Sequence, residues 1–261
     1  MRRSGTVEDY EKWVKRGRGQ GDGANYSAWL NLRDVPSRAT RSRLVSRRFG
    51  RPFYFMSNGE LITFFILEWD DSVIQIREQY PLDPTVTQQL ACKHSIRHPA
   101  VRGENIVMTT DFLVDYNVGG RRITKAIQVK HRPEDVADNR TQEKLRLEAL
   151  YWEGKSIPRE IVFSANYSPI LVSNLRQLFR WRNQKVTPRD LDRLSVELSE
   201  VLDRGPLPSS EIRVPRIRMA DADCIVSVDE ALKTLIAHKR IPFDIHTEHL
   251  QQREFALLRL S

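Results

Sequence analysis

Three polar residues around a predicted β-hairpin could share one chemical task. Asp111 precedes an Asn-Val-Gly-Gly segment at residues 117–120, and Gln128 and Lys130 follow it. Because both glycines tolerate positive φ, a two-residue turn at Gly119-Gly120 would place Asp111 directly across from Gln128. Opposed side chains of an antiparallel pair point to one face, which Lys130 shares because it lies two residues from Gln128. The spacing predicts a carboxylate, an amide and an ammonium on one side of the hairpin.

This set has the composition that phosphodiester hydrolysis needs. Mg²⁺ prefers oxygen ligands, which Asp111, the amide oxygen of Gln128 and the carbonyl of Val129 could supply. The cation lowers the pKa of a bound water and stabilises developing charge. Lys130 could orient or deprotonate that water and offset charge on the phosphate. Glu60, on a preceding predicted helix, could supply another carboxylate.

Each of these residues also has a purely structural interpretation. Ser57 and Glu60 have the spacing of a capping box, in which Glu60 only stabilises the start of a helix. Asp111 and Lys130 could form a salt bridge within the sheet. Glu148 could be an ordinary helical partner of Lys144. From the residue types alone, both kinds of interpretation stay open.

The elements expected around these residues follow the order αβββαβ. They are a helix beginning near Ser57, strands at 73–80, 107–116 and 123–130, a helix at 139–152 and a strand at 157–164. A long loop rich in Lys, Arg and His is expected between the first two strands. The expected fold is therefore α/β, with residues 1–165 as one domain.

The remainder of the chain, residues 166–261, is expected to form a second domain. Helices are predicted at 169–182, 187–202 and 227–238, the last with a capping box at Ser227 and Glu230. Two further segments, 241–245 and 254–260, could be strands of a wing. Three helices followed by a β-ribbon indicate a winged-helix-like domain.

Positive charge is concentrated at the start of the chain. Residues 1–51 contain 13 Lys and Arg against 5 Asp and Glu, whereas the remainder contains 29 of each. A basic segment on a neutral body is typical of proteins that bind the phosphate backbone, although a solvated tail would look the same. The candidate DNA contacts are Arg16, Arg18, Arg41, Arg43, Arg47 and Arg48, with Lys233, Lys239 and Arg240 near the other end, where a solvated helix face is the alternative.

Composition narrows the remaining possibilities. No segment approaches the ~20 consecutive apolar residues of a membrane-spanning helix, and the charged first residues lack the apolar core of a secretory signal. We therefore expect a cytoplasmic, nucleoid-associated protein. Cys92 and Cys224 are the only cysteines, too few for a disulfide framework or a zinc cluster. Any metal would need oxygen ligands.

The order αβββαβ, with an acid on the second strand and Lys at the end of the third, resembles the PD-(D/E)xK restriction-endonuclease-like superfamily. Gln128 departs from it, because an acid usually stands there, but glutamine is expected in one branch. That branch is the TnsA family, the endonuclease subunits of heteromeric cut-and-paste transposases. The segments that resemble it are GRGQG (17–21), ELITFFILEWDDSVIQIREQYPL (60–82), MTTDFLVDY (108–116), AIQVK (126–130) and RTQEKLRLEALYW (140–152).

The resemblance implies an active site and a reaction. It assigns Glu60, Asp111, Gln128 and Lys130 to catalysis, with Glu148 as a possible further metal ligand and Mg²⁺ as the cofactor, for which Mn²⁺ would substitute. The implied reaction is cleavage of the five-prime strands at transposon ends. The implied partners are a DDE transposase of the TnsB type, which cuts and joins the three-prime strands, and an AAA+ ATPase regulator of the TnsC type. In the family the second domain is winged-helix-like.

Two other functions remain open from the sequence. A stand-alone restriction- or resolvase-type nuclease would have the same fold and would cleave without partners. A non-catalytic DNA-binding or assembly subunit would retain the site only as scaffold. Gln128 favours the second alternative somewhat, because a neutral amide binds a divalent cation less strongly than a carboxylate does.

Overall fold

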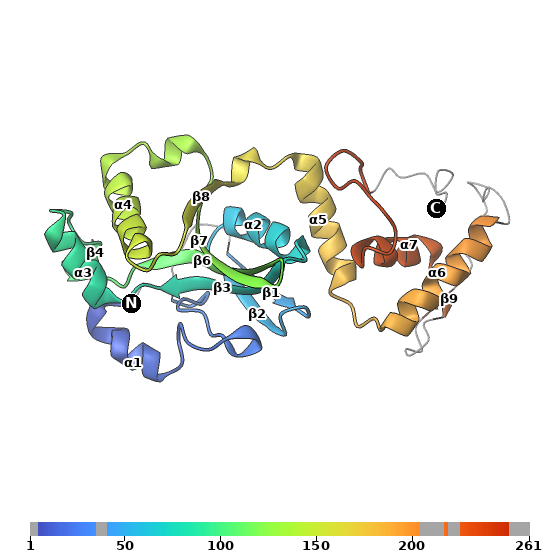
Figure 1. The fold of residues 1–261 in the computed structure, drawn as a ribbon, viewed down its shortest axis with the longest axis horizontal. Helices are drawn as coiled ribbons and strands as arrows, with labels where there is room; N and C mark the ends of the chain where they lie inside the picture. Colours follow the sequence, from blue (N-terminus) through green and yellow to red (C-terminus); the bar gives the residue numbers. More distant parts are fainter. Residues whose placement is uncertain (1–4, 35–40, 204–216, 219–224, 251–261) are drawn as a thin grey trace. The chain divides into compact units, whose positions relative to one another are not determined.

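The computed structural model of the protein describes residues 5–34, 41–203, 217–218 and 225–250. The chain divides into two compact units, Met1–Tyr167 and Ser168–Ser261 (Figure 1). The division lies two residues beyond the predicted boundary. Among the described residues, no helix is both long enough and apolar enough to cross a membrane.

A four-stranded sheet forms the centre of the first unit (Figure 1). Its strands, in the order β3-β6-β7-β8, are β3 (Val73–Pro81), β6 (Thr109–Val118), β7 (Arg121–Lys130) and β8 (Arg159–Phe163). The first three are antiparallel, whereas β7 and β8 are parallel and connected through α4 (Asn139–Glu153). All four strands were predicted, with ends that differ by two residues or fewer.

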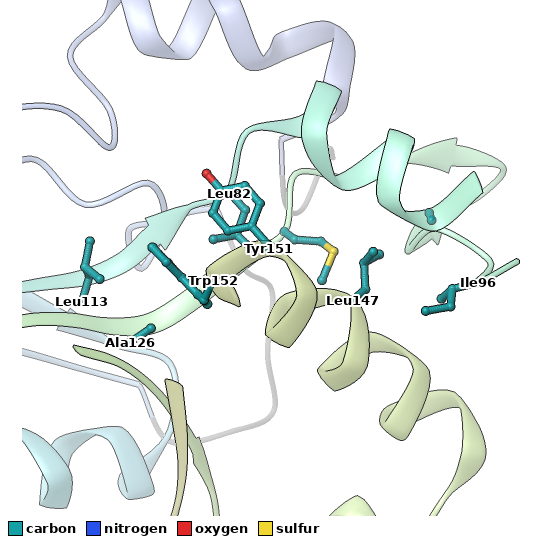
Figure 2. Packing of buried hydrophobic residues seen from close by; sticks show 9 residues of the cluster. Leu82, Ile96, Leu113, Ala126, Leu147, Tyr151 and Trp152 are labelled. Carbon is teal, nitrogen blue, oxygen red and sulfur yellow. The ribbon is translucent and has the colours of Figure 1, made fainter. Parts of the chain in front are cut away.

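Apolar residues are buried on both faces of the sheet. On one face, Phe112 packs near Phe55, which also contacts Phe64 of α2 (Asn58–Trp69). On the other face, Leu113 and Ala126 belong to a cluster with buried residues of α4 (Figure 2). The cluster comprises Leu82, Ala91, Ile96, Met108, Leu113, Ala126, Leu147, Tyr151 and Trp152. Both faces of the sheet are therefore covered by other elements. Side chains of the sheet can reach a substrate only at the ends of the strands or where the pairing between strands is interrupted.

The predicted loop after β3 contains a helix that we did not predict. This is α3 (Pro84–Lys93), and the side chain of Asp83 caps it by accepting hydrogen bonds from Thr85 N and Val86 N. The short pair β4 (Ala100–Val101) and β5 (Glu104–Asn105) follows it. The order from α2 to β8 is therefore αβαββαβ if this two-residue pair is set aside.

The basic N-terminal region also contains regular structure. Its elements are η1 (Val7–Asp9), α1 (Tyr10–Lys15), η2 (Gly23–Asn25), β1 (Ser42–Ser46) and β2 (Arg51–Phe55). Trp29 is fully buried among Tyr10 and Trp13. The glycine-rich loop at residues 17–23 lies against the sheet, because a Cβ at Gly19 would lie 2.3 Å from Cγ of Pro81. The loop is packed closely against β3.

The second unit consists mainly of helices in its described part. They are α5 (Pro169–Arg182), α6 (Pro188–Asp203) and α7 (Val228–Ala237), all three as predicted. Residues 241–245, predicted as the first wing strand, form no strand, and the second predicted strand, 254–260, lies outside the described residues. A short pair, β9 (Ile217–Arg218) and β10 (Ile225–Val226), instead precedes α7.

A buried ion pair joins the β1–β2 hairpin to the central sheet. Arg51 donates to both carboxylate oxygens of Glu78, at 3.0 and 2.6 Å, and to the carbonyl of Ile76. Its guanidinium also lies 3.7 Å from the ring centroid of Phe53. Arg51 therefore holds two β-elements together.

Replacing Glu78 by Gln should destabilise the protein strongly. The variant leaves the buried Arg51 charge without its counter-ion, which typically costs about 3 to 5 kcal/mol. Urea denaturation followed by circular dichroism would measure the change in the free energy of unfolding. Glu143→Gln is the control, because Glu143 forms an exposed pair with Arg140, for which a loss below about 1 kcal/mol is expected. Equal losses would contradict a special role for the buried pair.

Candidate active site

The pairing between strands β6 and β7 ends before it reaches Asp111. They pair from Val118–Arg121 to Phe112–Ile127, which confirms the predicted two-residue turn and its register. No pair follows Phe112–Ile127, whereas β7 continues to pair with β8 as far as Lys130. The sheet therefore opens between β6 and β7 where Gln128, Val129 and Lys130 face Asp111.

The ladder on the other side of β6 is interrupted at the same residue. Between Gln75 and Pro81, β3 pairs with β6 at every position except Gln79 opposite Asp111. Gln79 adopts a left-handed φ of 49°, a conformation that costs on the order of 1–3 kcal/mol for a residue other than glycine. The regular alternation from which we predicted a shared face therefore does not continue through Asp111.

The side chain of Asp111 occupies the opening. Its Oδ2 accepts a hydrogen bond of 2.7 Å from the backbone N–H of Val129. Because the N–H and C=O of one strand residue point toward the same neighbouring strand, the carbonyl of Val129 also faces the opening. The Asp111 carboxylate and the Val129 carbonyl therefore lie on the same side of β7. This proximity comes from a side-chain hydrogen bond and not from the regular strand pairing that we predicted.

Gln128 contributes an unsatisfied oxygen. Its Oε1 is buried and has no hydrogen-bond partner among the residues that the structure describes, whereas buried polar atoms in folded proteins nearly always have one. An unpaired buried carbonyl oxygen typically costs about 1–3 kcal/mol. A cation or a water bound there would remove this cost, so the atom fits the predicted role of a metal ligand.

Glu60 is held by three donors at the start of α2. Its carboxylate accepts hydrogen bonds from Met56 N (2.9 Å), Ser57 Oγ (3.0 Å) and Gln79 Nε2 (3.0 Å). Burial raises the pKa of Glu60, while these hydrogen bonds and the charge of Lys130 lower it. The capping interpretation is partly correct, because Ser57 Oγ accepts the Glu60 N–H. The Glu60 carboxylate, however, bonds to the Met56 N–H and not to that of Ser57.

The electrostatics of Asp111 favour a bound cation. Burial and then the negative charge of Glu60 raise the pKa of Asp111 well above its usual range, and Glu148 adds to this. The Val129 N–H and the charge of Lys130 lower it. Nearby carboxylates that repel one another are stabilised by an added positive charge. The donor set therefore suits a divalent cation.

Carboxylates alone would not complete such a site. Within the described part of the chain, no group of three or more His, Cys, Asp and Glu side chains is arranged to hold a metal. Amide and carbonyl oxygens, from Gln128 and Val129, would have to supply the remaining ligands, which suits a hard cation such as Mg²⁺.

Glu148 has partners of its own. One carboxylate oxygen accepts from Thr110 Oγ1 at 2.7 Å, and the other forms an ion pair of 2.8 Å with Arg159. Trp152 Nε1 also donates to Thr110 Oγ1. Glu148 therefore ties α4 to β6 and β8, and it affects Asp111 through its charge.

Several candidate DNA contacts are turned toward the protein. Arg18, Arg41 and Arg48 each donate to backbone carbonyls, and Arg18 also pairs with Asp34 at 2.7 Å. Each guanidinium thus fastens neighbouring segments. Charge counting could not distinguish this role from phosphate binding.

The other candidate DNA contacts lie nearer to solvent. Arg16, Arg43, Arg47 and Lys239 are exposed. Lys233 pairs with Asp229 at 2.5 Å, and Arg240 pairs with Asp192 at 3.1 Å. These two pairs favour the solvated-helix interpretation for the second unit, whereas Arg16, Arg43 and Arg47 keep the prediction of DNA contact open in the first.

Two aspartates of β6 should respond oppositely to loss of charge. Asp111→Asn should stabilise the metal-free protein at neutral pH by on the order of 1 kcal/mol, because a raised pKa means that the folded state disfavours the ionised carboxyl. Asp115→Asn should destabilise it by about 3–5 kcal/mol, because fully buried Asp115 pairs with Arg77 and Arg122.

Urea denaturation in EDTA from pH 4 to pH 8 would test this pair. The folded wild type holds the Asp111 proton more tightly than the unfolded chain, so its stability relative to Asp111→Asn should fall as pH rises above the ordinary carboxyl range. The advantage of the variant should therefore shrink toward pH 4. Destabilisation by Asp111→Asn at pH 8 would show that this carboxylate is structural, like Asp115.

Comparison with known proteins gives two matches. Residues 70–163 match the family model described as TnsA-like endonuclease N terminal, a range that contains Asp111, Gln128 and Lys130 but not Glu60. The transposon Tn7 transposition protein TnsA of Escherichia coli is 42% identical over 182 residues, which cover 70% of this chain and 66%, about two thirds, of that protein. The chain belongs to the TnsA-like endonuclease family.

Proposed function

We propose that this protein is a metal-dependent DNA endonuclease that cleaves the five-prime strands at transposon ends. The observation that carries the proposal is the end of β6–β7 pairing at Phe112–Ile127, beyond which Asp111 Oδ2 bonds to the Val129 N–H and the adjacent Gln128 has an unsatisfied buried oxygen. Membership of the TnsA-like endonuclease family supports the reaction. The αβαββαβ order, once α3 is set aside as an insertion, supports a restriction-endonuclease-like fold for the first unit.

Asp111, the carbonyl of Val129, the amide oxygen of Gln128 and Glu60 would hold Mg²⁺, or Mn²⁺ in its place. When bound, such a cation activates a water nucleophile and offsets charge that develops on the phosphate. The Val129 N–H fixes the orientation of the Asp111 carboxylate. Glu60 is kept in place by its three donors, so both acids are positioned before substrate binds.

Lys130 would act on the substrate side of the site. It is the last residue of β7, and its charge lowers the pKa of both Glu60 and Asp111. Its ammonium would orient the attacking water and stabilise the negative charge of the pentacovalent phosphate. Glu148, whose carboxylate oxygens already have partners, would influence the site through its charge only.

Duplex DNA at transposon ends is the proposed substrate. The exposed Arg16, Arg43 and Arg47 would contact its backbone phosphates. A DDE transposase of the TnsB type and an AAA+ regulator of the TnsC type are the proposed partners, because the relative is a Tn7 transposition protein. The protein would bind this DNA in the nucleoid. A winged-helix-like fold is proposed for the second unit. The three helices α5, α6 and α7 support it.

Asp111→Asn should abolish five-prime-strand cleavage while the protein stays folded. Loss of a metal ligand should lower the rate by at least about 100-fold, since even partners that only orient ligands contribute 10- to 100-fold. The measurement is strand-resolved cleavage of an end-labelled transposon end in Mg²⁺, with the cognate transposase and ATPase present. Unchanged five-prime cuts by the variant would support a scaffold role instead.

A second variant separates metal binding from chemistry. Lys130→Met should lower cleavage to a similar extent and leave Mn²⁺ affinity unchanged or higher, because it removes a positive charge near both acids. Lys125→Met is the matched control, since Lys125 lies on the same strand, pairs within the regular ladder and contacts the ring of Tyr116. If both lysine variants cleave normally, Lys130 has no catalytic role.

A further inference from the structure

Gln79 is an unusual residue at the edge of the proposed site. It lies within β3, is only 3% exposed and has a left-handed φ of 49°. The same residue is the unpaired position opposite Asp111 in the β3–β6 ladder. A backbone distortion buried inside a strand is therefore located beside the proposed metal ligand, where strained residues commonly have a functional role.

The side chain of Gln79 bonds to the second proposed acid. Its Nε2 donates to Oε2 of Glu60 at 3.0 Å, and the same oxygen accepts from Met56 N at 2.9 Å. The other oxygen, Oε1, accepts from Ser57 Oγ. Met56 and Ser57 precede α2 directly, whereas Gln79 reaches Glu60 from the sheet. The hydrogen bond from Gln79 connects the Glu60 carboxylate to β3, the strand that lies opposite Asp111.

We propose that Gln79 is a positioning residue for the metal site, which holds the Glu60 carboxylate in the orientation that places it beside Asp111. This inference rests on the proposed function and extends it to a residue in which the sequence shows no catalytic pattern. Outer partners of this kind orient the ligands of metal sites and affect metal affinity. The left-handed conformation has a structural consequence as well, because it leaves Asp111 outside the β3–β6 ladder.

The identity of residue 79 distinguishes a positioning role from a purely structural role. Glycine adopts a left-handed φ without steric cost, so a position that only needed the backbone bend would be best filled by glycine. A glutamine bears the strain and supplies an amide donor. Substitution can therefore separate the steric strain from the amide donor, because alanine removes only the donor whereas glycine removes both.

The test compares Gln79→Gly, Gln79→Ala and wild type in full-length protein. Both variants lose the amide, but only the alanine variant keeps the strained backbone. Mn²⁺ affinity is measured by isothermal titration calorimetry, and melting temperature is measured without metal. We expect both variants to bind Mn²⁺ about 10- to 100-fold more weakly, and the glycine variant to melt at a higher temperature than the alanine variant.

Ser156→Gly is the matched control, because Ser156 has a left-handed φ of 53° in an exposed turn. It should bind Mn²⁺ as the wild type does. Wild-type affinity in both Gln79 variants would overturn the inference, and so would a loss of binding that follows a loss of folded structure. Asp111→Asn, titrated in parallel, distinguishes the two failures: if it also binds normally, the proposed metal site itself is wrong.

Discussion

The hydrogen bond from the Val129 N–H to the Asp111 carboxylate takes the place of a backbone contact between β6 and β7. A strand pair normally satisfies its own N–H and C=O groups. Here a side chain satisfies one donor, and the neighbouring carbonyl faces the same opening. The sheet can therefore open at its functional end without leaving the Val129 N–H unsatisfied.

Firm packing elsewhere makes such an opening tolerable. The Phe112 face is covered by aromatic residues near α2, and the Leu113 face is covered by the cluster on α4. Glu148 ties α4 to β6 and β8 close to the opening. The buried ion pair of Arg51 with Glu78 holds the β1–β2 hairpin against β3. Rigid surroundings of this kind keep two repelling acids close together before any cation binds.

Local chemistry decided which parts of this arrangement could be predicted. Gly119-Gly120 fixed the hairpin register, and Ser57 with the apolar run after it fixed α2. The helix α3 was missed because Thr85, Val86 and Thr87 are β-branched and its apolar periodicity is weak. The β1–β2 hairpin was missed because arginines obscure its alternation.

The fine geometry of the site depends on contacts between strands, which one strand's sequence does not reveal. Nothing in residues 109–118 indicates that Asp111 leaves both ladders. The adjacent polar pair Glu78 and Gln79, both buried, was the available signal for an irregularity in β3. In the same way, charge alone could not show that Arg48 would bond to backbone carbonyls.

The most direct test of this account is a crystal structure of the protein with Mn²⁺, with the ion located by its anomalous signal. One ion is expected in the opening between β6 and β7, about 2 Å from Asp111 and from the carbonyl of Val129, with the amide oxygen of Gln128 turned toward it. An ion bound elsewhere, or an empty opening in which the protein itself satisfies Gln128 Oε1, would contradict it.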